Sequence, residues 1–350
     1  MKKTIDRRSF IKKAGGTALA MTSVGALAGC GKSSGRKAQK GNSDSGEMTY
    51  RTNKADGDKV SILGYGCMRW PMIKNAEDKD IVDQETVNSL IDHALAKGVN
   101  YFDSAPVYLQ GQCETATGEA LSRHPRESYF IATKLSNFKN AEREFGLEMY
   151  RKSLEAFRTD YLDYYLLHSI SGAEAFNKRF VANGLIDFLV EERKAGRIKN
   201  LGFSFHGSKE GFDELMALHE KYHWDFVQIQ LNYIDWNYAS KRNTNASYLQ
   251  EELDKRGIPS VIMEPLLGGR LADAPDRIAD RPKEMNPQGT IASRASRFAG
   301  SHEGVLTVLS GMNCMEHLQD NIKTYSPLVP LTEKERNFLE DIARMRMEYP

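Results

Sequence analysis

Short, nearly continuous apolar runs alternate along this chain with longer stretches in which apolar residues recur every three or four positions. The runs are rich in β-branched and aromatic residues, which is typical of strands that are buried on both faces. We predict eight such strands, at 63–68, 99–103, 129–134, 161–168, 200–205, 226–232, 259–264 and 305–310. The stretch Gln84–Ala96 predicts an amphipathic helix, which Lys97 and Gly98 end.

Eight strand–helix units predict a closed parallel barrel. Parallel strands need crossover connections, and the chain from residue 59 onward has the size of a (β/α)8 TIM barrel. The alternative is an open doubly wound sheet with a glycine-rich phosphate loop after its first strand, but 63–68 (Leu-Gly-Tyr-Gly-Cys-Met) lacks the third glycine. Asp56-Gly57, between two extended runs at 48–61, predicts a β-hairpin that plugs the bottom of the barrel.

The first 46 residues are expected to lie outside this barrel. Residues 6–12 (Asp-Arg-Arg-Ser-Phe-Ile-Lys) resemble the twin-arginine export consensus, and 27–30 (Leu-Ala-Gly-Cys) resemble a lipobox. We therefore predict an export signal over 1–29, a flexible tether over 30–46 and one barrel domain over 47–350. The signal predicts a protein on the periplasmic side, held at a membrane only by a lipid on Cys30.

Composition narrows the classes of function. Apolar residues make up 40% and charged residues 27% of the chain, as in soluble globular proteins. Residues 1–29 hold six basic residues and one acidic residue, so without them the formal charge changes from +1 to −4. Since no basic stripe lies outside the signal, we expect no nucleic-acid binding. The spacing of Cys67, Cys113 and Cys314 suits neither a metal site nor a disulfide framework, so we expect core packing and no bound metal.

Reactive side chains stand at the ends of three consecutive predicted strands. Asp103 ends the second strand and Tyr108 lies in the loop that follows. Lys134 and His168 end the third and fourth strands. Active sites of TIM barrels are built at the carboxyl ends of the strands, and charged groups at the ends of apolar strands are unfavourable unless they are paired. The sequence therefore predicts one shared site.

These four side chains suit the protonation of a carbonyl oxygen. A free tyrosine has a pKa of about 10, and we expect the Lys134 ammonium to lower that pKa while Asp103 holds Lys134 charged. Tyr108 can then protonate an oxygen that gains negative charge as hydride reaches its carbon. His168 can hydrogen-bond the same oxygen. None of the four supplies hydride, so a nicotinamide cofactor is implied.

The segments that hold these residues resemble the aldo/keto reductase family. The resemblance runs from about Ser61 to Asn321 and is carried by 63–66 (Leu-Gly-Tyr-Gly), 98–105 (Gly-Val-Asn-Tyr-Phe-Asp-Ser-Ala) and 161–168 (Tyr-Leu-Asp-Tyr-Tyr-Leu-Leu-His). It implies a NAD(P)H-dependent reductase of small aldehydes or ketones, usually with NADPH bound in extended form, and with NADH as the alternative. Its catalytic tetrad falls on Asp103, Tyr108, Lys134 and His168.

The resemblance also implies a cofactor site, although this part of the chain departs from the family pattern. Phe205 stands where an Asn is common, and Met263 where an aromatic residue usually stacks on the nicotinamide. His317 stands where NADPH-specific members commonly carry Arg, which recognises a phosphate better than a neutral imidazole does. The implied cofactor-binding residues are Ser204, Gln228, Met263, Pro265, Gly311, His317 and Asn321.

Several questions about the biological role stay open at this level. The segments 263–269 and 309–313 resemble a branch whose members often continue into a cysteine-rich ferredoxin-like tail, and no such cysteines occur up to Pro350. The alternative to an active reductase is a nicotinamide-binding regulatory or redox-partner subunit with little turnover, because such a subunit would share the tetrad. Export further implies a protein partner that transfers electrons or supplies the cofactor. The carbonyl substrate depends on rim loops at 169–183 and 237–246.

Overall fold

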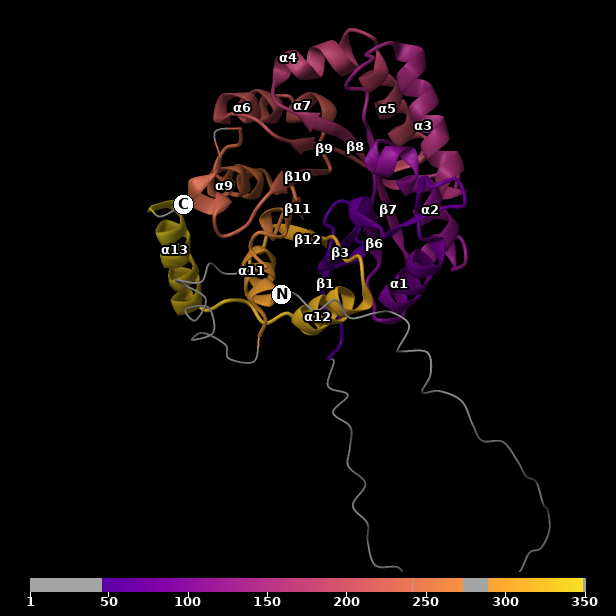
Figure 1. Ribbon diagram of the computed structural model, residues 1–350. Coiled ribbons are helices and arrows are strands. Elements are labelled where there is room, and N and C mark those ends of the chain that lie inside the picture. Colours follow the sequence, from indigo (N-terminus) through magenta and orange to yellow (C-terminus); the bar gives the residue numbers. More distant parts are fainter. Residues whose placement is uncertain (1–45, 241, 273–288, 349–350) are drawn as a thin grey trace, which may run out of the picture. The chain divides into compact units, whose positions relative to one another are not determined.

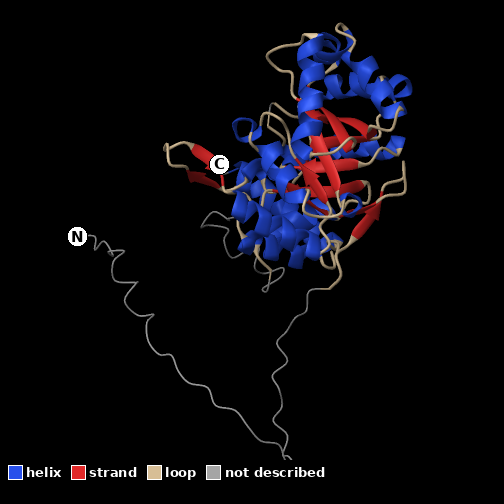
Figure 2. Cartoon of the chain, turned by 90° about the vertical axis from the view of Figure 1, so that its right-hand side faces the viewer, coloured by secondary structure: helices blue, strands red, loops and turns tan. Residues whose placement is uncertain are grey.

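The computed structural model describes residues 46–240, 242–272 and 289–348, and within them a closed barrel of parallel strands (Figures 1 and 2). Each strand pairs in parallel with the next, and β12 closes the barrel against β3. The predicted (β/α)8 barrel is therefore confirmed and the open sheet is excluded. The barrel strands are β3 (Leu63–Gly66), β6 (Tyr101–Asp103), β7 (Phe130–Leu135), β8 (Leu162–Ile170), β9 (Ile198–Phe205), β10 (Phe226–Gln230), β11 (Ser260–Met263) and β12 (Val305–Ser310).

The barrel strands are buried on both faces, which explains why their sequences are almost continuously apolar. The rings of Tyr101, Tyr164 and Phe226 pack in a chain inside the barrel, with centroids 4.9 Å and 5.1 Å apart. Tyr165 and Leu167, at alternate positions of β8, belong instead to the larger core beneath the surrounding helices. Each predicted strand is present, with ends that differ by a few residues.

Helices surround the barrel (Figure 1). The predicted helix is confirmed as α1, whose N-cap Asp83 accepts a hydrogen bond from the backbone N–H of Thr86. Before α13, Thr332 and Glu335 exchange the hydrogen bonds of a capping box. The α-helices are α1 (Gln84–Ala96), α2 (Cys113–Leu121), α3 (Arg143–Phe157), α4 (Ala173–Phe176), α5 (Leu185–Lys194), α6 (Lys209–Ala217), α7 (His219–Tyr222), α8 (Asp235–Tyr238), α9 (Ala246–Arg256), α11 (Ile291–Gly300), α12 (Met315–Tyr325) and α13 (Glu333–Glu348). Short 3-10 turns are η2 (Cys67–Arg69), η3 (Tyr108–Gly111), η4 (Arg126–Ser128) and η6 (Leu267–Gly269), and η5 (Asn177–Val181) is a π-helix.

Two hairpins in the described part of the chain flank the barrel. The predicted one is confirmed as antiparallel β1 (Tyr50–Thr52) and β2 (Lys59–Ser61), and Asn53 in its turn donates to the Tyr164 hydroxyl and to Asn200 Oδ1 at 3.2 Å and 3.1 Å. It thus closes the amino-terminal end of the barrel. A second hairpin, β4 (Met72–Lys74) with β5 (Asp80–Val82), was not predicted, because its short strands are largely exposed and lack a buried apolar pattern.

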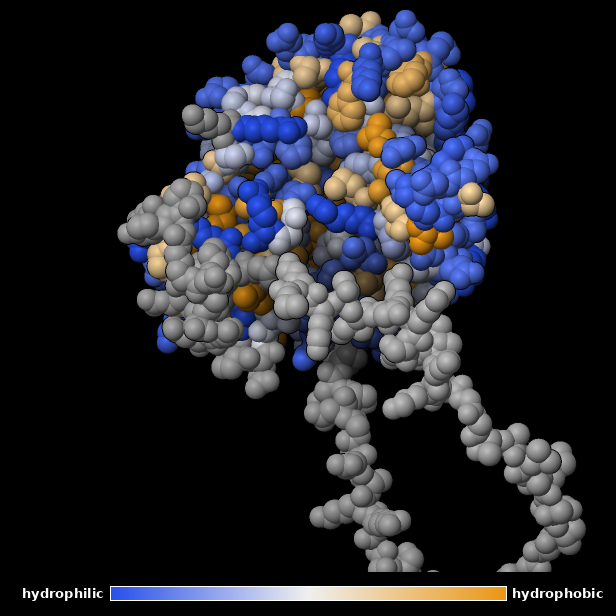
Figure 3. All heavy atoms as spheres, in the orientation of Figure 1, coloured by the Kyte–Doolittle hydropathy of each residue, from blue (hydrophilic) through white to orange (hydrophobic). Residues whose placement is uncertain are grey.

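The face of the molecule in Figure 3 is mainly polar and shows hydrophobic residues in small, separate groups. No helix among the described residues combines the length and the apolar character that crossing a membrane requires. Cys67 and Cys113 are buried, as expected for core packing, whereas Cys314 is partly exposed; all three are free thiols. The predicted export signal over 1–29 and nearly all of the predicted tether, including Cys30, lie outside the described residues.

Candidate active site

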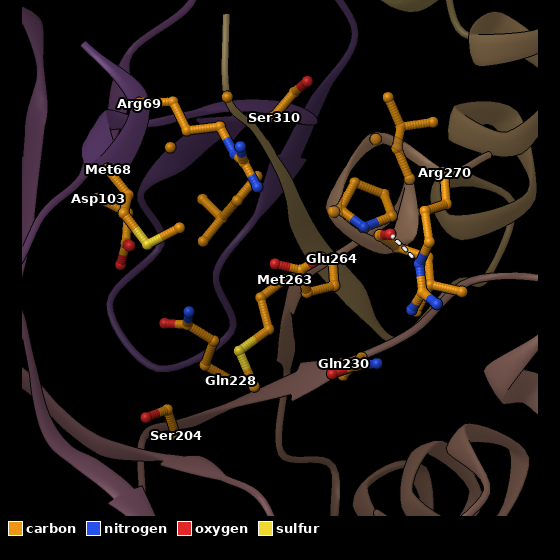
Figure 4. A pocket seen from close by; sticks show the side chains of 18 of the residues that line it. Met68, Arg69, Asp103, Ser204, Gln228, Gln230, Met263, Glu264, Arg270 and Ser310 are labelled. Carbon is orange, nitrogen blue, oxygen red and sulfur yellow. Dashed lines mark hydrogen bonds between the residues drawn. The ribbon is translucent and has the colours of Figure 1, made fainter. Parts of the chain in front are cut away.

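A cavity of about 1070 Å³ opens at the carboxyl ends of the barrel strands (Figure 4). Parallel strands leave their carboxyl ends on one rim, so side chains that are far apart in sequence meet there. The structure brings together every residue that the sequence assigned to catalysis or cofactor binding. The cavity lining includes Asp103, Tyr108, Lys134, His168, Ser204, Gln228, Met263, Pro265, Gly311, His317 and Asn321.

A buried ion pair lies at the base of the site. Lys134 Nζ donates to Asp103 Oδ1 at 2.6 Å and to the carbonyl oxygen of Ser104 at 2.7 Å, and the Lys134 side chain is fully buried. Burial alone would lower the pKa of Lys134, but the charges of Asp103 and Tyr108 raise it above its ordinary value. Lys134 is therefore an ammonium group with a fixed position.

Tyr108 lies directly above this ammonium group, which is 5.1 Å from the centroid of the tyrosine ring. Leu109 and Gln110 adopt left-handed backbone conformations, with φ of 48° and 57°, so the chain turns sharply after Tyr108. Burial raises the pKa of Tyr108, and Lys134 offsets this only in part. Lys134 thus lowers this pKa as expected, but burial outweighs it and the pKa stays above its ordinary value. The hydroxyl of Tyr108 is protonated at neutral pH and can act as an acid.

His168 is a neutral side chain. Burial, together with the charges of Lys134 and Arg179, lowers the pKa of His168 to about 2. Its Nδ1 lies 2.6 Å from the hydroxyl oxygen of Ser136. When that hydroxyl donates to Nδ1, the single ring proton stands on Nε2, where it is available to a substrate oxygen. The ring centroids of His168 and Tyr108 are 5.8 Å apart, so both groups can serve one carbonyl.

Sequence reasoning missed Ser136, although it carries a usable signal. Ser136 follows Lys134 by two positions, and residues two apart along an extended chain point to the same side. The spacing alone would therefore have predicted that the Ser136 hydroxyl faces the same site as Lys134.

Arg179, on the π-helix η5, fixes the end of β8. Its Nη1 donates to the carbonyl oxygens of His168 and Ser169 at 2.8 Å and 3.1 Å, and its Nε and Nη2 donate to Asn137 Oδ1. The guanidinium also lies 4.7 Å from the ring centroid of Phe138, which is itself 4.9 Å from the His168 ring. π-helical turns occur frequently at functional sites, and this one positions His168 together with its apolar neighbour.

The wall beside His168 fits a carboxamide. Ser204 Oγ accepts a hydrogen bond from the backbone N–H of Ser169 at 2.7 Å, which leaves its own hydroxyl proton available. Gln228 Oε1 is buried and has no hydrogen-bond partner in the described part of the chain. A buried acceptor without a partner is unusual, and the amide N–H of a nicotinamide would satisfy it.

Phe205 does not belong to this wall. Its ring packs in the core against Phe212, with centroids 5.0 Å apart. The next residue, His206, lines the cavity instead. The departure of Phe205 from the family pattern therefore places an apolar core side chain where an Asn is common.

The opposite end of the cavity suits a phosphate. Gly311 lies in the loop between β12 and α12 and His317 in the first turn of α12, and the amino end of a helix favours anions. His317 Nδ1 is 2.9 Å from Asn313 Oδ1, and the His317 side chain is exposed. Asn321 Nδ2 donates to Ser310 Oγ at 3.0 Å. Arg69, which the sequence did not single out, extends its side chain into the cavity beside this end (Figure 4).

Comparison with known proteins adds a family match. The family model described as "Aldo/keto reductase family" matches residues 63–344. The uncharacterized oxidoreductase YqkF of Bacillus subtilis (strain 168) is 23% identical over 323 residues, which cover 80% of this chain and 92% of that protein. The probable aldo-keto reductase 1 of Glycine max is 31% identical over 156 residues, which are 42% of each chain.

A solved structure shares the fold. An aldo/keto reductase from Klebsiella pneumoniae, determined in complex with NADP and acetate, superimposes with a TM-score of 0.66 at 21% identity. The match covers 83% of this chain and 94% of that one. The (β/α)8 barrel is thus common to both proteins.

Proposed function

Since this chain belongs to the aldo/keto reductase family, we propose that it reduces an aldehyde or ketone to the corresponding alcohol with NADPH, and that Tyr108 is the general acid. The observation that carries the proposal is the meeting of a protonated tyrosine, a buried Lys134–Asp103 pair and a neutral His168 at one cavity. The Klebsiella relative, whose structure holds NADP, supports the choice of cofactor.

The cavity offers a place for each end of the cofactor. A bound nicotinamide cofactor would supply the hydride. Ser204 and Gln228 would hold its carboxamide, and the unpaired Gln228 Oε1 supports this fit. Met263 and Pro265 would flank the nicotinamide ring. Gly311, His317 and Asn321 would hold the phosphate end, where Arg69 adds positive charge.

Tyr108 transfers a proton to the substrate oxygen. As the carbonyl carbon is reduced, negative charge grows on its oxygen, the Tyr108 O–H bond breaks and a new O–H bond forms on the substrate. Tyr108 is left as a phenolate, which the Lys134 ammonium beneath it stabilises. Asp103 keeps that ammonium charged and oriented, and solvent returns the proton to Tyr108 after the alcohol leaves.

His168 orients the carbonyl group before this transfer. Its Nε2–H can donate to the carbonyl oxygen from the side, because Ser136 satisfies Nδ1. The ring stays neutral because it is buried beside two cationic side chains. His168 is thus a hydrogen-bond donor throughout the reaction and leaves proton transfer to Tyr108.

A two-step experiment tests the proposal. NADPH and NADH are titrated against the purified protein with fluorescence detection, and NADPH oxidation is then followed with a panel of small aldehydes and ketones. We expect NADPH binding, and turnover of about 1 to 10³ per second with at least one carbonyl compound. Failure to bind either nucleotide would contradict the proposal. Tight binding without turnover on the whole panel would favour the regulatory or redox-partner role.

A further inference from the structure

A series of hydrogen bonds along the cavity wall connects His206 to the carboxylate of Asp235. His206 Nδ1 lies 3.1 Å from Asn243 Oδ1, and Asn243 Nδ2 lies 3.3 Å from Gln230 Oε1. Gln230 Nε2 in turn lies 2.6 Å from Asp235 Oδ2. His206, Asn243 and Gln230 all line the cavity, and Figure 4 shows Gln230 at its wall. They come from the ends of β9 and β10 and from the loop between α8 and α9.

The direction of these hydrogen bonds is set at the carboxylate end. Asn232 Oδ1 accepts the backbone N–H groups of Ile234 and Asp235 at 3.0 Å and 2.9 Å, so the orientation of its amide is not ambiguous. Asn232 Nδ2 therefore faces Asp235 Oδ2 and donates to it at 2.6 Å. The Asp235 carboxylate oxygen is the acceptor of that bond. Gln230 must consequently present its amide nitrogen, and not its oxygen, to Asp235.

Every later bond in the series follows from this one. With its nitrogen at Asp235, Gln230 presents its oxygen to Asn243, which must donate through Nδ2. Asn243 then presents Oδ1 to His206, so the proton of the imidazole stands on Nδ1. The reverse tautomer would require both amides to flip and would place the Gln230 oxygen against the Asp235 carboxylate.

The other ring nitrogen of His206 is left as an acceptor. Burial lowers the pKa of His206, so the ring is neutral at pH 7 and Nε2 carries a lone pair. Nε2 makes no hydrogen bond with the residues that the structure describes, while the ring lines the cavity. The charges of Arg242 and Glu264 act on the pKa of His206 in opposite directions, and the neutral ring of His168 lies on the neighbouring strand.

We propose that His206 Nε2 accepts a hydrogen bond from a hydroxyl group of the substrate, and that the enzyme therefore prefers hydroxylated aldehydes or ketones. This inference rests on the proposed function, which places the carbonyl group at Tyr108 and His168. The two histidines then have opposite hydrogen-bonding roles. His168 donates to the carbonyl oxygen, His206 accepts from the hydroxyl, and a hydroxycarbonyl compound carries both of the groups that match.

The tautomer of His206 can be measured without any substrate. Histidine ring nitrogens are observed by ¹H–¹⁵N NMR in protein labelled with ¹⁵N-histidine, and the His206 signals are assigned by their loss in His206→Leu. We expect a protonated Nδ1 and an unprotonated Nε2 at pH 7, and a shift toward the other tautomer in Asn243→Ala. A protonated Nε2 in the unmodified protein would overturn the inference, whether or not the protein reduces carbonyls.

The substrate preference is tested with NADPH and three aldehydes. Propanal has no second polar group, DL-glyceraldehyde adds hydroxyl groups, and succinic semialdehyde adds a carboxylate. We expect kcat/KM for glyceraldehyde to exceed that for propanal by about tenfold, the effect of one hydrogen bond. In His206→Leu this ratio falls to about one. The matched control is His93→Leu, on α1 and outside the cavity lining, which retains the ratio.

The outcomes separate the inference from the proposed function. Equal use of propanal and glyceraldehyde, or a preference that survives in His206→Leu, would overturn the inference. A strong preference for succinic semialdehyde would do the same, because it would assign this part of the wall to an anion at Arg242. If neither these aldehydes nor the panel of aldehydes and ketones described above oxidises NADPH, the proposed function fails, and the NMR measurement still decides the state of His206.

Discussion

Two side chains outside the tetrad, Ser136 and Arg179, determine how His168 presents itself to a substrate. In the proposed mechanism the Ser136 hydroxyl donates to His168 Nδ1 and so keeps the ring proton on Nε2, while Arg179 holds the backbone carbonyl of His168 in place. A donor must point to where negative charge develops in order to stabilise a transition state. The activity of His168 therefore depends on these neighbours as well as on the ring itself.

Removing the Ser136 hydroxyl tests this dependence. In Ser136→Ala, Nδ1 of His168 loses its hydrogen-bond donor, and the ring proton can move from Nε2 to Nδ1. A proton on Nδ1 cannot form a hydrogen bond with the substrate oxygen. We expect kcat/KM for carbonyl reduction to fall about tenfold, with NADPH affinity unchanged. Ser89→Ala is the matched control, since Ser89 lies exposed on α1 and hydrogen-bonds only a helix carbonyl. Equal activity of both variants would show that Ser136 does not orient His168.

The pH profile follows from the protonation states of Tyr108 and His168. Tyr108 must be protonated to act as an acid, and because its pKa is raised by burial, it loses its proton only as the pH rises above about 10. His168 has a pKa of about 2, so its charge does not change near neutrality. We expect kcat/KM for reduction to be flat from about pH 6 to about pH 9 and to fall at higher pH. A step near pH 6.5 that disappears in His168→Asn would contradict this assignment.

At the scale of elements, the sequence predicts best those segments whose burial leaves a periodic trace. The barrel strands and α1 were predictable because both faces of each strand, and one face of the helix, are apolar. The hairpin of β4 and β5 leaves no such trace, because Val82 is the single buried residue of its two strands. The tetrad was predictable for a related reason, since strand ends in a barrel share one rim.

The series of hydrogen bonds from His206 to Asp235 could not be predicted in the same way. Its members come from three separate segments, and only the folded loops bring Asn243 between His206 and Gln230. Nothing local marks Asn243, since an asparagine in a polar loop is usual. The Lys134–Asp103 pair differs because each partner ends an apolar strand, where an isolated charge would be unfavourable.

Helix packing gives a prediction for stability. Gly118 brings α2 against α3 so closely that an added Cβ would lie 2.0 Å from the carbonyl oxygen of Ala156. Gly118→Ala therefore has to push the two helices apart, and we expect it to lower the free energy of unfolding by about 1 to 3 kcal/mol. Glu119→Ala, at the adjacent position, should change it by less than about 0.5 kcal/mol. Denaturant unfolding measures both values, and equal stability would contradict the tight contact.

At the scale of the whole molecule, we propose that residues 1–29 are an export signal, and this proposal has a consequence for how the enzyme obtains its cofactor. A twin-arginine route carries folded proteins, so a nucleotide bound before export could travel with the chain. The cavity has room for such a ligand at about 1070 Å³, and residues from opposite ends of it would hold the nucleotide. An exported protein that retains its nucleotide would not need a supply of nucleotide outside the cytoplasm.

This account predicts that the protein keeps a nicotinamide nucleotide through purification. The nucleotide is released by denaturation and identified by chromatography and absorbance. A stoichiometric amount would support loading before export. Protein that is empty, and that binds NADPH and NADH only at millimolar concentration, would contradict retention and leave supply by a partner as the alternative.

The most direct test of the central claim is the effect of Tyr108→Phe on carbonyl reduction. The substitution removes only the hydroxyl that donates the proton and keeps the ring above Lys134. We predict a fall in kcat of roughly 10² to 10⁴, with the Kd for NADPH unchanged by fluorescence titration. Wild-type turnover in Tyr108→Phe, with the same NADPH affinity, would show that Tyr108 is not the general acid.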